Sequence, residues 1–273
     1  MTIRWLRRRA SALPAIARLV LLRRCMNDGG DASRLYFASS PDIEVETPLI
    51  KESATALAAW AARPGEIFTV SDADGVGYRA RLVSLDPPVA IPFVRLAESH
   101  EGCELVLCQA LPARERFELI LEKLTELGAA RIVPFSSRHS LTLKERDASQ
   151  RKSHRWPHLL QRASRQCRRT MLPELSDVLP FEAMLQEVHE ADLALILDVR
   201  PEALPLRQLF ATAQTPQRIA LLVGPEGGFA PEEIAQAQQA GAIAVSLGQR
   251  ILRTESAAIV TASLLQYRFG DLG

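Results

Sequence analysis

Three short and almost entirely apolar segments lie in the C-terminal half of the chain: Leu193–Asp198, Ile219–Gly224 and Ile243–Gly248. Strands that are apolar along their whole length are typical of a parallel sheet that is covered on both faces. Pro231 and the two glutamates after it indicate the start of a helix between the last two segments, and Gly241 indicates its end. We therefore predict an α/β domain built on a parallel sheet.

The same alternation of strands and helices extends toward the middle of the chain. Leu105–Ala110 and Arg131–Ser136 are predicted strands, and Glu115–Leu127 between them is a predicted helix. The apolar residues of that helix recur at helical spacing: Phe117, Ile120, Leu121, Leu124 and Leu127. A mostly apolar helix is predicted at Thr254–Arg268, so we expect this domain to span residues 103–273.

The part of the chain before residue 98 carries a different pattern. Turn-forming residues such as Pro64-Gly65 and Asp74-Gly75 separate short runs that are typical of strands. The predicted strands are Arg34–Ala38, Glu66–Ser71, Tyr78–Leu85 and Val89–Leu96. We predict a small β-barrel or sandwich over residues 31–98, followed by a polar linker at Glu98–Gly102.

Residues 1–30 do not fit either domain. The apolar run Ala10–Leu22 is interrupted by Pro14 and Arg18 and is too short to span a bilayer, so we expect no membrane association. Its arginine-rich flanks without acidic residues are similar to a transit peptide, and Met26 offers an alternative start. We interpret these residues as an extension outside the folded core, and we expect a cytoplasmic protein.

Positive charge is strongly segregated along the chain, although the formal net charge is only +1. Residues 138–170 hold ten Lys and Arg against two acidic residues, and the segment 151–169 within them is a predicted helix. Such segregation favours a polyanionic partner, with a solvated helix face as the alternative. Arginine is the main cation, with 29 Arg against 4 Lys, which suits phosphate recognition.

The four cysteines indicate no metal site, because no Cys-x-x-Cys and no pairing with histidine at zinc spacing occurs. Cys103 and Cys108 are an odd number of residues apart on a predicted strand, so they are expected on opposite faces. His154 and His158 are four residues apart on a predicted helix, but no third ligand is near them in the sequence. We therefore predict buried, reduced thiols and no bound metal.

Two glycine-containing loops follow the predicted parallel strands. Ligands of open α/β sheets bind beyond the carboxyl ends of the strands, where Gly224–Gly228 and Gly248–Thr254 both lie. Glycine allows a close backbone approach and positive φ. Neither loop has the Gly-Lys-Ser/Thr of a triphosphate site or the Gly-x-Gly-x-x-Gly of a dinucleotide site, and no hydrolase or metalloprotease motif occurs.

At these loops the chain resembles a known family. Leu222–Gly228, then Ser246–Gly248 with Ile251–Glu255, are similar to the RsmE family of 16S ribosomal RNA (uracil-N3)-methyltransferases, in the SPOUT superfamily. Glu122-Lys123 with Glu126–Gly128, Gln166-Cys167 and Gln266–Asp271 are similar as well. The resemblance is strong over residues 103–273 and weak before them.

The resemblance implies S-adenosylmethionine as the cofactor, a SPOUT-type sheet with a C-terminal trefoil knot, and a PUA-like N-terminal domain that docks RNA. It also implies a homodimer that acts on 16S ribosomal RNA in the small ribosomal subunit. By the family's pattern the cofactor-binding residues are Gly224, Glu226, Gly227, Leu247, Gly248, Ile251, Leu252 and Arg253. The predicted RNA-binding residues are Lys123, Arg138, Arg162, Arg165, Arg168 and Arg169.

Arg253 and Glu226 are the predicted catalytic residues. N3 of uracil must lose a proton before it attacks the methyl group, and Arg253 at a helix N-terminus can stabilise the negative charge that develops on a uracil oxygen. Glu226 can accept the proton. The alternatives are that Glu226 caps backbone N–H groups of its own loop and that Glu255 is a structural anion at the helix N-terminus.

Two segments depart from the family's pattern. The N-terminal domain of the family usually carries a His ahead of a Gly-containing turn, whereas Thr55–Arg63 has no His. The segment Arg165–Arg169 stands where the family usually has Glu-Gln-Cys/Ser-Gly-Arg. Both changes affect expected RNA contacts and leave the cofactor loops intact. They keep open two other hypotheses: another SPOUT reaction, on a ribose 2′-oxygen or a guanine, and an RNA-binding assembly factor without catalytic activity.

Overall fold

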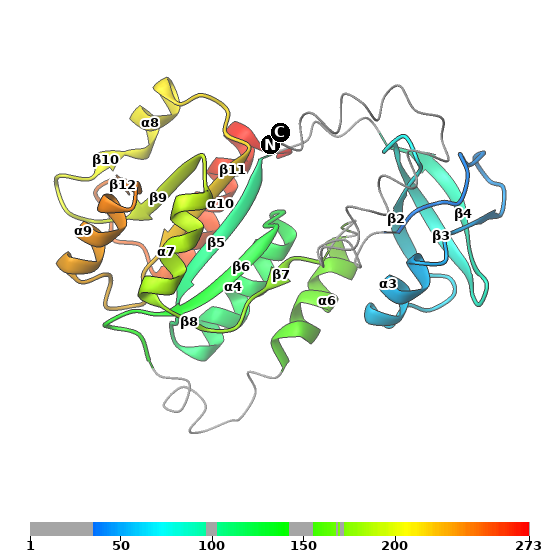
Figure 1. Cartoon of the computed structure of the whole chain (residues 1–273), viewed down its shortest axis with the longest axis horizontal. Coiled ribbons are helices and arrows are strands. Elements are labelled where there is room, and N and C mark those ends of the chain that lie inside the picture. Colours follow the sequence, from blue (N-terminus) through cyan, green and yellow to red (C-terminus); the bar gives the residue numbers. More distant parts are fainter. Residues whose placement is uncertain (1–34, 97–102, 142–154, 168, 170–171, 273) are drawn as a thin grey trace. The chain divides into compact units, whose positions relative to one another are not determined.

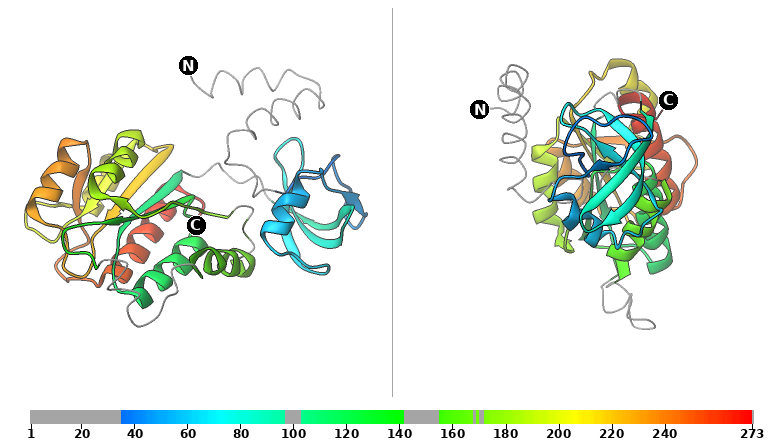
Figure 2. Two further views of the ribbon diagram at one scale, coloured as in Figure 1. Left: turned by 60° about the horizontal axis from the view of Figure 1, so that its bottom comes forward. Right: turned by 90° about the vertical axis from the view of Figure 1, so that its right-hand side faces the viewer.

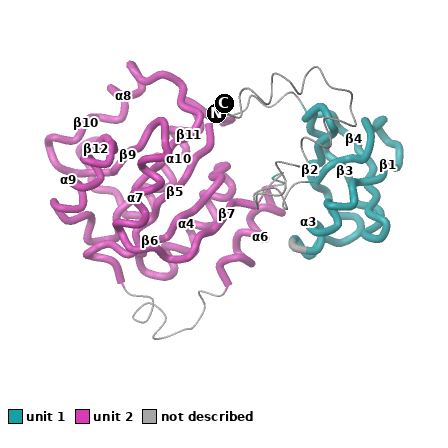
Figure 3. The backbone as a smooth tube through the Cα atoms, in the orientation of Figure 1, with its two compact units in different colours: residues 1–99, 168–171 teal, residues 100–167, 172–273 magenta. Residues whose placement is uncertain are grey.

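The computed structural model describes residues 35–96, 103–141, 155–167, 169 and 172–272. The chain divides into two compact units, residues 1–99 with 168–171 and residues 100–167 with 172–273 (Figure 3).

In its described residues, the first unit contains a four-stranded antiparallel sheet and one helix. The strands lie in the order β1 (Thr47–Pro48), β4 (Pro88–Arg95), β3 (Gly77–Leu85) and β2 (Ile67–Ser71). The helix α3 (Ser53–Ala59) lies where no helix is predicted, and its run of alanine and leucine is the signal that would have indicated it. Trp60 and Phe68 pack at 5.4 Å between ring centroids in the buried core of this unit.

The segment 35–38 connects the two edge strands of this sheet. The Phe37 N–H donates to the Ser71 carbonyl at the end of β2, and the Ala38 N–H donates to the Pro48 carbonyl of β1, both at 2.9 Å. The prediction of a regular strand at Arg34–Ala38 is wrong in form, because only isolated bridges form within the described part of this segment. These bridges nevertheless provide partners for backbone groups on both edges of the sheet.

The second unit contains an eight-stranded sheet in which every pairing is parallel. In spatial order its strands are β10 (Leu204–Pro205), β12 (Ile243–Ser246), β9 (Leu193–Leu197), β11 (Arg218–Val223), β5 (Glu104–Ala110), β6 (Arg131–Ser136) and β7 (Glu174–Leu175), and β8 (Leu179–Pro180) also pairs with β6. The predicted parallel α/β sheet is confirmed. The three apolar segments are β12, β9 and β11, which lie beside one another in this order (Figure 1).

Helices cover both faces of this sheet. One face packs on α4 (Arg114–Glu126), α6 (Trp156–Cys167), α8 (Leu206–Thr212) and α10 (Thr254–Phe269), which share a buried cluster with alternate strand residues. The other face packs on α7 (Phe181–Glu190) and α9 (Pro231–Gln239). Figure 2 (left) shows α4 and α10 on the same side of the sheet. The helix predicted at 151–169 begins, in the described residues, only at Trp156.

Cys103 and Cys108 belong to the two opposite clusters, as their odd separation predicts. Both thiols are buried and free, and burial raises the pKa of Cys103 to about 11 and raises the pKa of Cys108 as well. No helix in the described ranges is long and apolar enough to cross a membrane.

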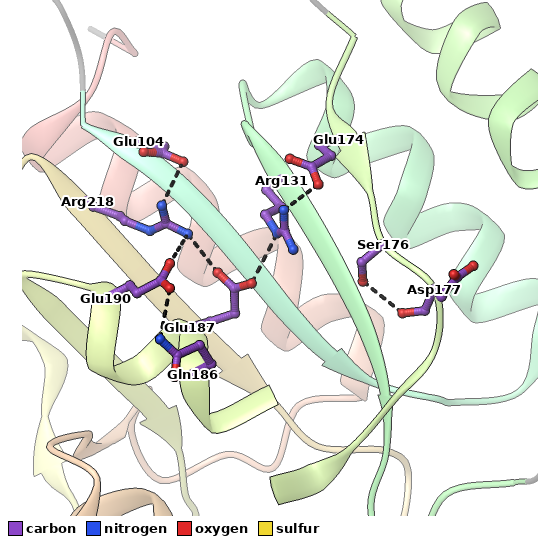
Figure 4. Close-up of polar contacts among 9 residues, drawn as sticks. All are labelled: Glu104, Arg131, Glu174, Ser176, Asp177, Gln186, Glu187, Glu190 and Arg218. Atoms are coloured by element: carbon purple, nitrogen blue, oxygen red, sulfur yellow. Dashed lines mark hydrogen bonds and ion pairs between the residues drawn. The ribbon is translucent and has the colours of Figure 1, made fainter. Parts of the chain in front are cut away.

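The amino edge of the sheet is held by a buried ion-pair cluster around Glu187 of α7 (Figure 4). Its carboxylate, with a side chain only 7% exposed, lies 2.7 Å from Arg218 Nη2 and 3.1 Å from Arg131 Nε. Those arginines are the first residues of β11 and β6, and Arg218 also pairs with Glu104, the first residue of β5, at 3.5 Å. The helix α7 is therefore tied directly to the start of β6 and β11, and through Arg218 to the start of β5.

Candidate active site

The loops at the carboxyl edge of the sheet come from several strands. The two predicted loops, Gly224–Gly228 and Gly248–Thr254, follow β11 and β12, and residues 111–113 and 137–141 follow β5 and β6. Because all these strands are parallel, their following loops meet at one edge. The structure therefore places the two predicted cofactor loops together with two further loops at this edge.

A buried amide joins the first loop to the start of α10. Gln109, the residue before the end of β5, is fully buried, and its Nε2 donates to Thr254 Oγ1 at 3.1 Å and lies 3.3 Å from the Gly224 carbonyl. Thr254 Oγ1 in turn donates to the same carbonyl at 2.6 Å. The chain segments joined in this way are more than 100 residues apart in sequence, so sequence patterns did not reveal Gln109 as part of the site.

The glycines of the first loop are required by their neighbours. A Cβ on Gly224 would lie 3.3 Å from the backbone of Gly228, and a Cβ on Gly227 would lie 3.0 Å from Cβ of His139. Gly228 itself has φ of +68°, which side chains with a Cβ rarely adopt. The His139 ring, whose Nδ1 lies 3.2 Å from the Gly228 carbonyl, covers the loop from the end of β6.

Glu233 fixes the loop after β6 beside the glycine loop. One oxygen of its buried carboxylate accepts the Arg138 N–H at 2.8 Å, and the other accepts the Ala230 N–H at the start of α9, also at 2.8 Å. Arg138 therefore extends from an ordered backbone at the carboxyl edge. Its side chain is 69% exposed and lies 3.6 Å from the carboxylate of Glu232.

Glu226 faces the first turn of α4. Its Oε1 accepts the Ala113 N–H at 2.8 Å and lies 3.0 Å from Arg116 Nη1. The same guanidinium lies 3.9 Å, through Nε, from Oε2 of Glu255 in the first turn of α10. Glu226 thus caps a backbone N–H group, as the structural alternative proposed, but the group belongs to the loop before α4 and not to its own loop.

The second loop presents the exposed side chains of Gln249, Arg250, Ile251 and Arg253 beside half-buried ones. Leu247 packs against the core, Gly248 has φ of +111°, and Ile251 is 82% exposed. Leu252 is half-buried, and Arg253 is exposed at the N-cap of α10. Within the described residues the Arg253 guanidinium makes no hydrogen bond or ion pair, so it is available to a ligand.

These residues fit a nucleoside cofactor such as S-adenosylmethionine. The first loop exposes glycine backbone at Gly227, which a ligand can approach closely, and Ile251 offers apolar surface for a ring. Gln109 Oε1 and Glu255 Oε2 are buried and have no hydrogen-bond partner within the described parts of the chain. Buried polar atoms without partners are expected where a ligand or water completes the site.

The predicted RNA-binding residues do not gather at one place. Lys123 lies seven residues beyond Arg116 on α4, about 10 Å along the helix axis and away from the carboxyl edge. Its Nζ lies 2.9 Å from Glu126 and 3.0 Å from Glu122, and these hydrogen bonds raise the pKa of Lys123. Glu122 also pairs with Arg162 of α6 at 3.3 Å, so these two cations share acidic partners.

Arg138 is the predicted RNA-binding residue that lies beside the cofactor loops. Arg165 is half-buried near the end of α6, and Arg169 is half-buried beyond it. Arg168 lies outside the described residues.

Comparison with known proteins identifies what these loops belong to. The family described as an RNA methyltransferase domain matches residues 99–266. The chain is 34% identical over 216 residues to the ribosomal RNA small subunit methyltransferase E of Mycobacterium bovis, covering 72% of this chain and 77% of that protein.

Two solved structures are similar over almost their whole length. The ribosomal RNA small subunit methyltransferase E of Neisseria gonorrhoeae, bound to S-adenosylmethionine, is 27% identical with a TM-score of 0.60 over 88% of this chain and 99% of that one. A Legionella pneumophila protein in complex with the same cofactor is 28% identical, with a TM-score of 0.59 over 86% and 97% of the two chains. The resemblance carried by the two loops is confirmed, and the chain belongs to the RsmE family of small-subunit ribosomal RNA methyltransferases.

Proposed function

We propose that this chain methylates N3 of one uridine in 16S ribosomal RNA of the small ribosomal subunit, with S-adenosylmethionine as the methyl donor. The observation that carries the proposal is the pair of glycine loops at the carboxyl edge. Beside them lies the Arg253 guanidinium, which makes no hydrogen bond or ion pair within the described residues. Relatives that carry the small-subunit methyltransferase name, and a similar structure bound to S-adenosylmethionine, support it.

The cofactor would be held by residues of both loops. Backbone groups at Gly224, Gly227 and Gly248 would allow close approach, Leu247, Ile251 and Leu252 would provide apolar contacts, and Glu226 and Arg253 would complete the site. When bound, S-adenosylmethionine supplies a methyl group on a positively charged sulfur, ready for transfer to a nucleophile.

Arg253 and Glu226 would act on the uracil. Arg253 lies where the N-terminal dipole of α10 adds to its charge, so it can stabilise negative charge on a uracil oxygen as N3 loses its proton. Within the described residues both donors to Glu226 contact Oε1. Oε2 is therefore the atom of this carboxylate that can take up the N3 proton.

The exposed surface of α10 supports a homodimer. Val260, Leu264 and Tyr267 are 40%, 39% and 72% exposed and recur at helical spacing along one face of the helix. A contiguous apolar face on a monomer is typical of an interaction site. We propose that two copies of the chain cover this face in each other, and that sedimentation analysis detects a dimer.

We also propose how the chain binds RNA and that its second domain is knotted. The bonds from residues 35–38 to both edge strands support a small PUA-like barrel at residues 31–98, which would dock RNA in the cytoplasm. Family membership supports a trefoil knot in the domain 103–273, with residues 1–30 outside the core. The basic residues of 138–170 would follow phosphates.

The test is a nucleoside analysis of methylated RNA. Purified protein is incubated with S-adenosylmethionine and small ribosomal subunits from a strain that lacks this gene, and the RNA is digested for mass spectrometry. We expect 3-methyluridine. A methyl group on a ribose 2′-oxygen or a guanine would replace the proposal by another SPOUT reaction, and RNA binding without cofactor binding or methylation would indicate an assembly factor.

A further inference from the structure

Arg116 of α4 lies between two carboxylates, one in the first cofactor loop and one in the first turn of the helix that follows the second loop. Its Nη1 is 3.0 Å from Glu226 Oε1 in the loop after β11, and its Nε is 3.9 Å from Glu255 Oε2 in the first turn of α10. The three side chains come from segments that are far apart in sequence and meet only at the carboxyl edge of the sheet. A single guanidinium therefore pairs with the first loop and with the start of the helix that follows the second loop.

The two loops are joined in two layers. The inner layer is neutral and buried: Gln109 and Thr254 both contact the Gly224 carbonyl. The outer layer is charged and about one third exposed, with side chain exposures of 35% for Arg116 and 32% for Glu226. Because water screens a pair that is this exposed, Arg116 is expected to add little to the stability of the fold. Its main effect is therefore expected on the geometry of the loops.

Glu255 gives a reason why this geometry depends on Arg116. Its side chain is 13% exposed, and Oε2 is buried without a hydrogen-bond partner within the described residues. Arg116 is the cation that lies near this oxygen. Without it, the largely buried carboxylate would lose this ion pair at the start of α10, the helix whose N-cap is Arg253. A shift of this first turn would displace the Arg253 guanidinium as well.

We propose that Arg116 is a positioning residue for methyl transfer: its guanidinium holds the carboxylates of Glu226 and Glu255, and thereby keeps the two loops and Arg253 in their productive arrangement. The inference rests on the proposed function, because it concerns the same site. Arg116 need not touch the substrate or the cofactor, since it acts through the two glutamates.

The test compares Arg116→Met and Arg116→Lys with the matched control Arg114→Met. Arg114 lies on the same turn of α4 and pairs with Glu118 of its own helix at 2.7 Å. For each variant the thermal midpoint, the S-adenosylmethionine Kd from calorimetry, and kcat and KM for RNA are measured. Arg116→Met should lower kcat on the order of tenfold or more, because small displacements of reacting groups are costly, while KM for RNA and the thermal midpoint stay near those of the wild type.

The conservative variant separates positioning from charge. Arg116→Lys should restore only part of kcat, because an ammonium is a point charge and cannot serve two carboxylates as a planar guanidinium does. Double-mutant cycles of Arg116→Met with Glu226→Gln and with Glu255→Gln should show non-additive losses in kcat, since each pair acts as one unit.

Several results would overturn the inference. A wild-type kcat in Arg116→Met would overturn it. An equal loss of kcat in Arg114→Met, or additive losses of kcat in both double-mutant cycles, would overturn it as well. If Arg116→Met fails to fold, wild-type kcat in Arg116→Lys overturns it instead. A wild-type protein that neither binds S-adenosylmethionine nor methylates RNA would remove the proposed function itself, whereas an active wild type with an indifferent Arg116 removes only this inference.

Discussion

The two edges of the parallel sheet use charge in opposite ways. At the amino edge, Glu187 is buried and is contacted by Arg131 and Arg218, so the charges there are paired within the protein. At the carboxyl edge, the Arg253 side chain is exposed and makes no ion pair within the described residues. The amino edge is therefore built to hold strands and a helix together, whereas the carboxyl edge, besides its own ion pairs, keeps the charge of Arg253 for a ligand.

The two ends of the strands differ in the same way. Each of the strands β5, β6 and β11 begins with a charged residue that enters the cluster around Glu187. The strands β11 and β12 instead lead into loops in which glycines adopt positive φ or leave no room for a Cβ. Parallel α/β sheets bind ligands at their carboxyl edge, so substitutions at the amino edge should change stability and substitutions at the carboxyl edge should change activity.

The largest effect is expected at the amino edge, from Glu187→Ala. The substitution leaves two partly buried arginines without their shared carboxylate, which should lower the free energy of unfolding by about 3–5 kcal/mol. Denaturant unfolding measures the loss, and the cofactor Kd at low temperature should stay unchanged. Glu190→Ala is the matched control on the same helix, because Glu190 is 49% exposed and lies 3.6 Å from Arg218. An equal loss in both variants would contradict the role given to Glu187.

Arg253→Ala should give the largest loss of activity. The substitution removes the cation expected to stabilise negative charge on the uracil, so kcat should fall roughly a hundredfold, with a smaller change in cofactor affinity. Methylation under saturating conditions and calorimetric titration measure the two quantities. Arg207→Ala, an exposed arginine on α8, controls for loss of one positive charge. Equal losses in rate and cofactor affinity would show that Arg253 only holds the cofactor.

Gly227→Ala should affect the carboxyl edge without unfolding the protein. A new Cβ would lie 3.0 Å from His139 Cβ, so the loop or His139 must move by a few tenths of an ångström, and cofactor affinity should fall about tenfold. Gly241→Ala is the control, because its φ of +110° makes alanine strained while nothing lies near the new Cβ. That control should lose about 1 kcal/mol of stability and no cofactor affinity. A loss of affinity in both would show a general effect of destabilisation.

The architecture of the second unit could be predicted because its signals are local. Uninterrupted apolar runs indicated β9, β11 and β12, and helical spacing of apolar residues indicated α4. The helices α3 and α8 and the short strands β1, β7, β8 and β10 were not predicted. Strands of two residues carry no periodicity, and the alanine-rich stretch of α3 lies among strand-like segments.

The site was predicted only in part, because some of its members have no local signal. The glycine loops and Arg253 are recognisable as motifs, whereas Gln109, Arg116 and His139 acquire meaning only when the order of the strands brings them together. Glu187 is similar: its partners lie 31 and 56 residues away, and nothing in the sequence around α7 identifies them. The sequence alone does not reveal which distant residue a single polar side chain will contact in the fold.

The smallest effect is expected from single arginines that contact phosphate. Arg138 and Arg162 are a matched pair, with exposures of 69% and 70% and one acidic partner each, but Arg138 lies at the carboxyl edge and Arg162 pairs with Glu122 near the far end of α4. If RNA follows the whole basic segment, alanine at either position should weaken RNA affinity severalfold. Each should also reduce the slope of log affinity against log salt by about 0.7–0.9.

Binding measured at several salt concentrations distinguishes the two positions, with Arg207→Ala as the control for one lost charge. A reduced slope for Arg138→Ala alone would confine the RNA to the carboxyl edge and remove the case for phosphate contact by α6. A reduced slope for both would extend the RNA surface across both edges of the sheet. Exposed cations would then contact RNA at both the amino and the carboxyl edge of the sheet. The amino edge would differ from the carboxyl edge only in the ion pairs around the buried Glu187.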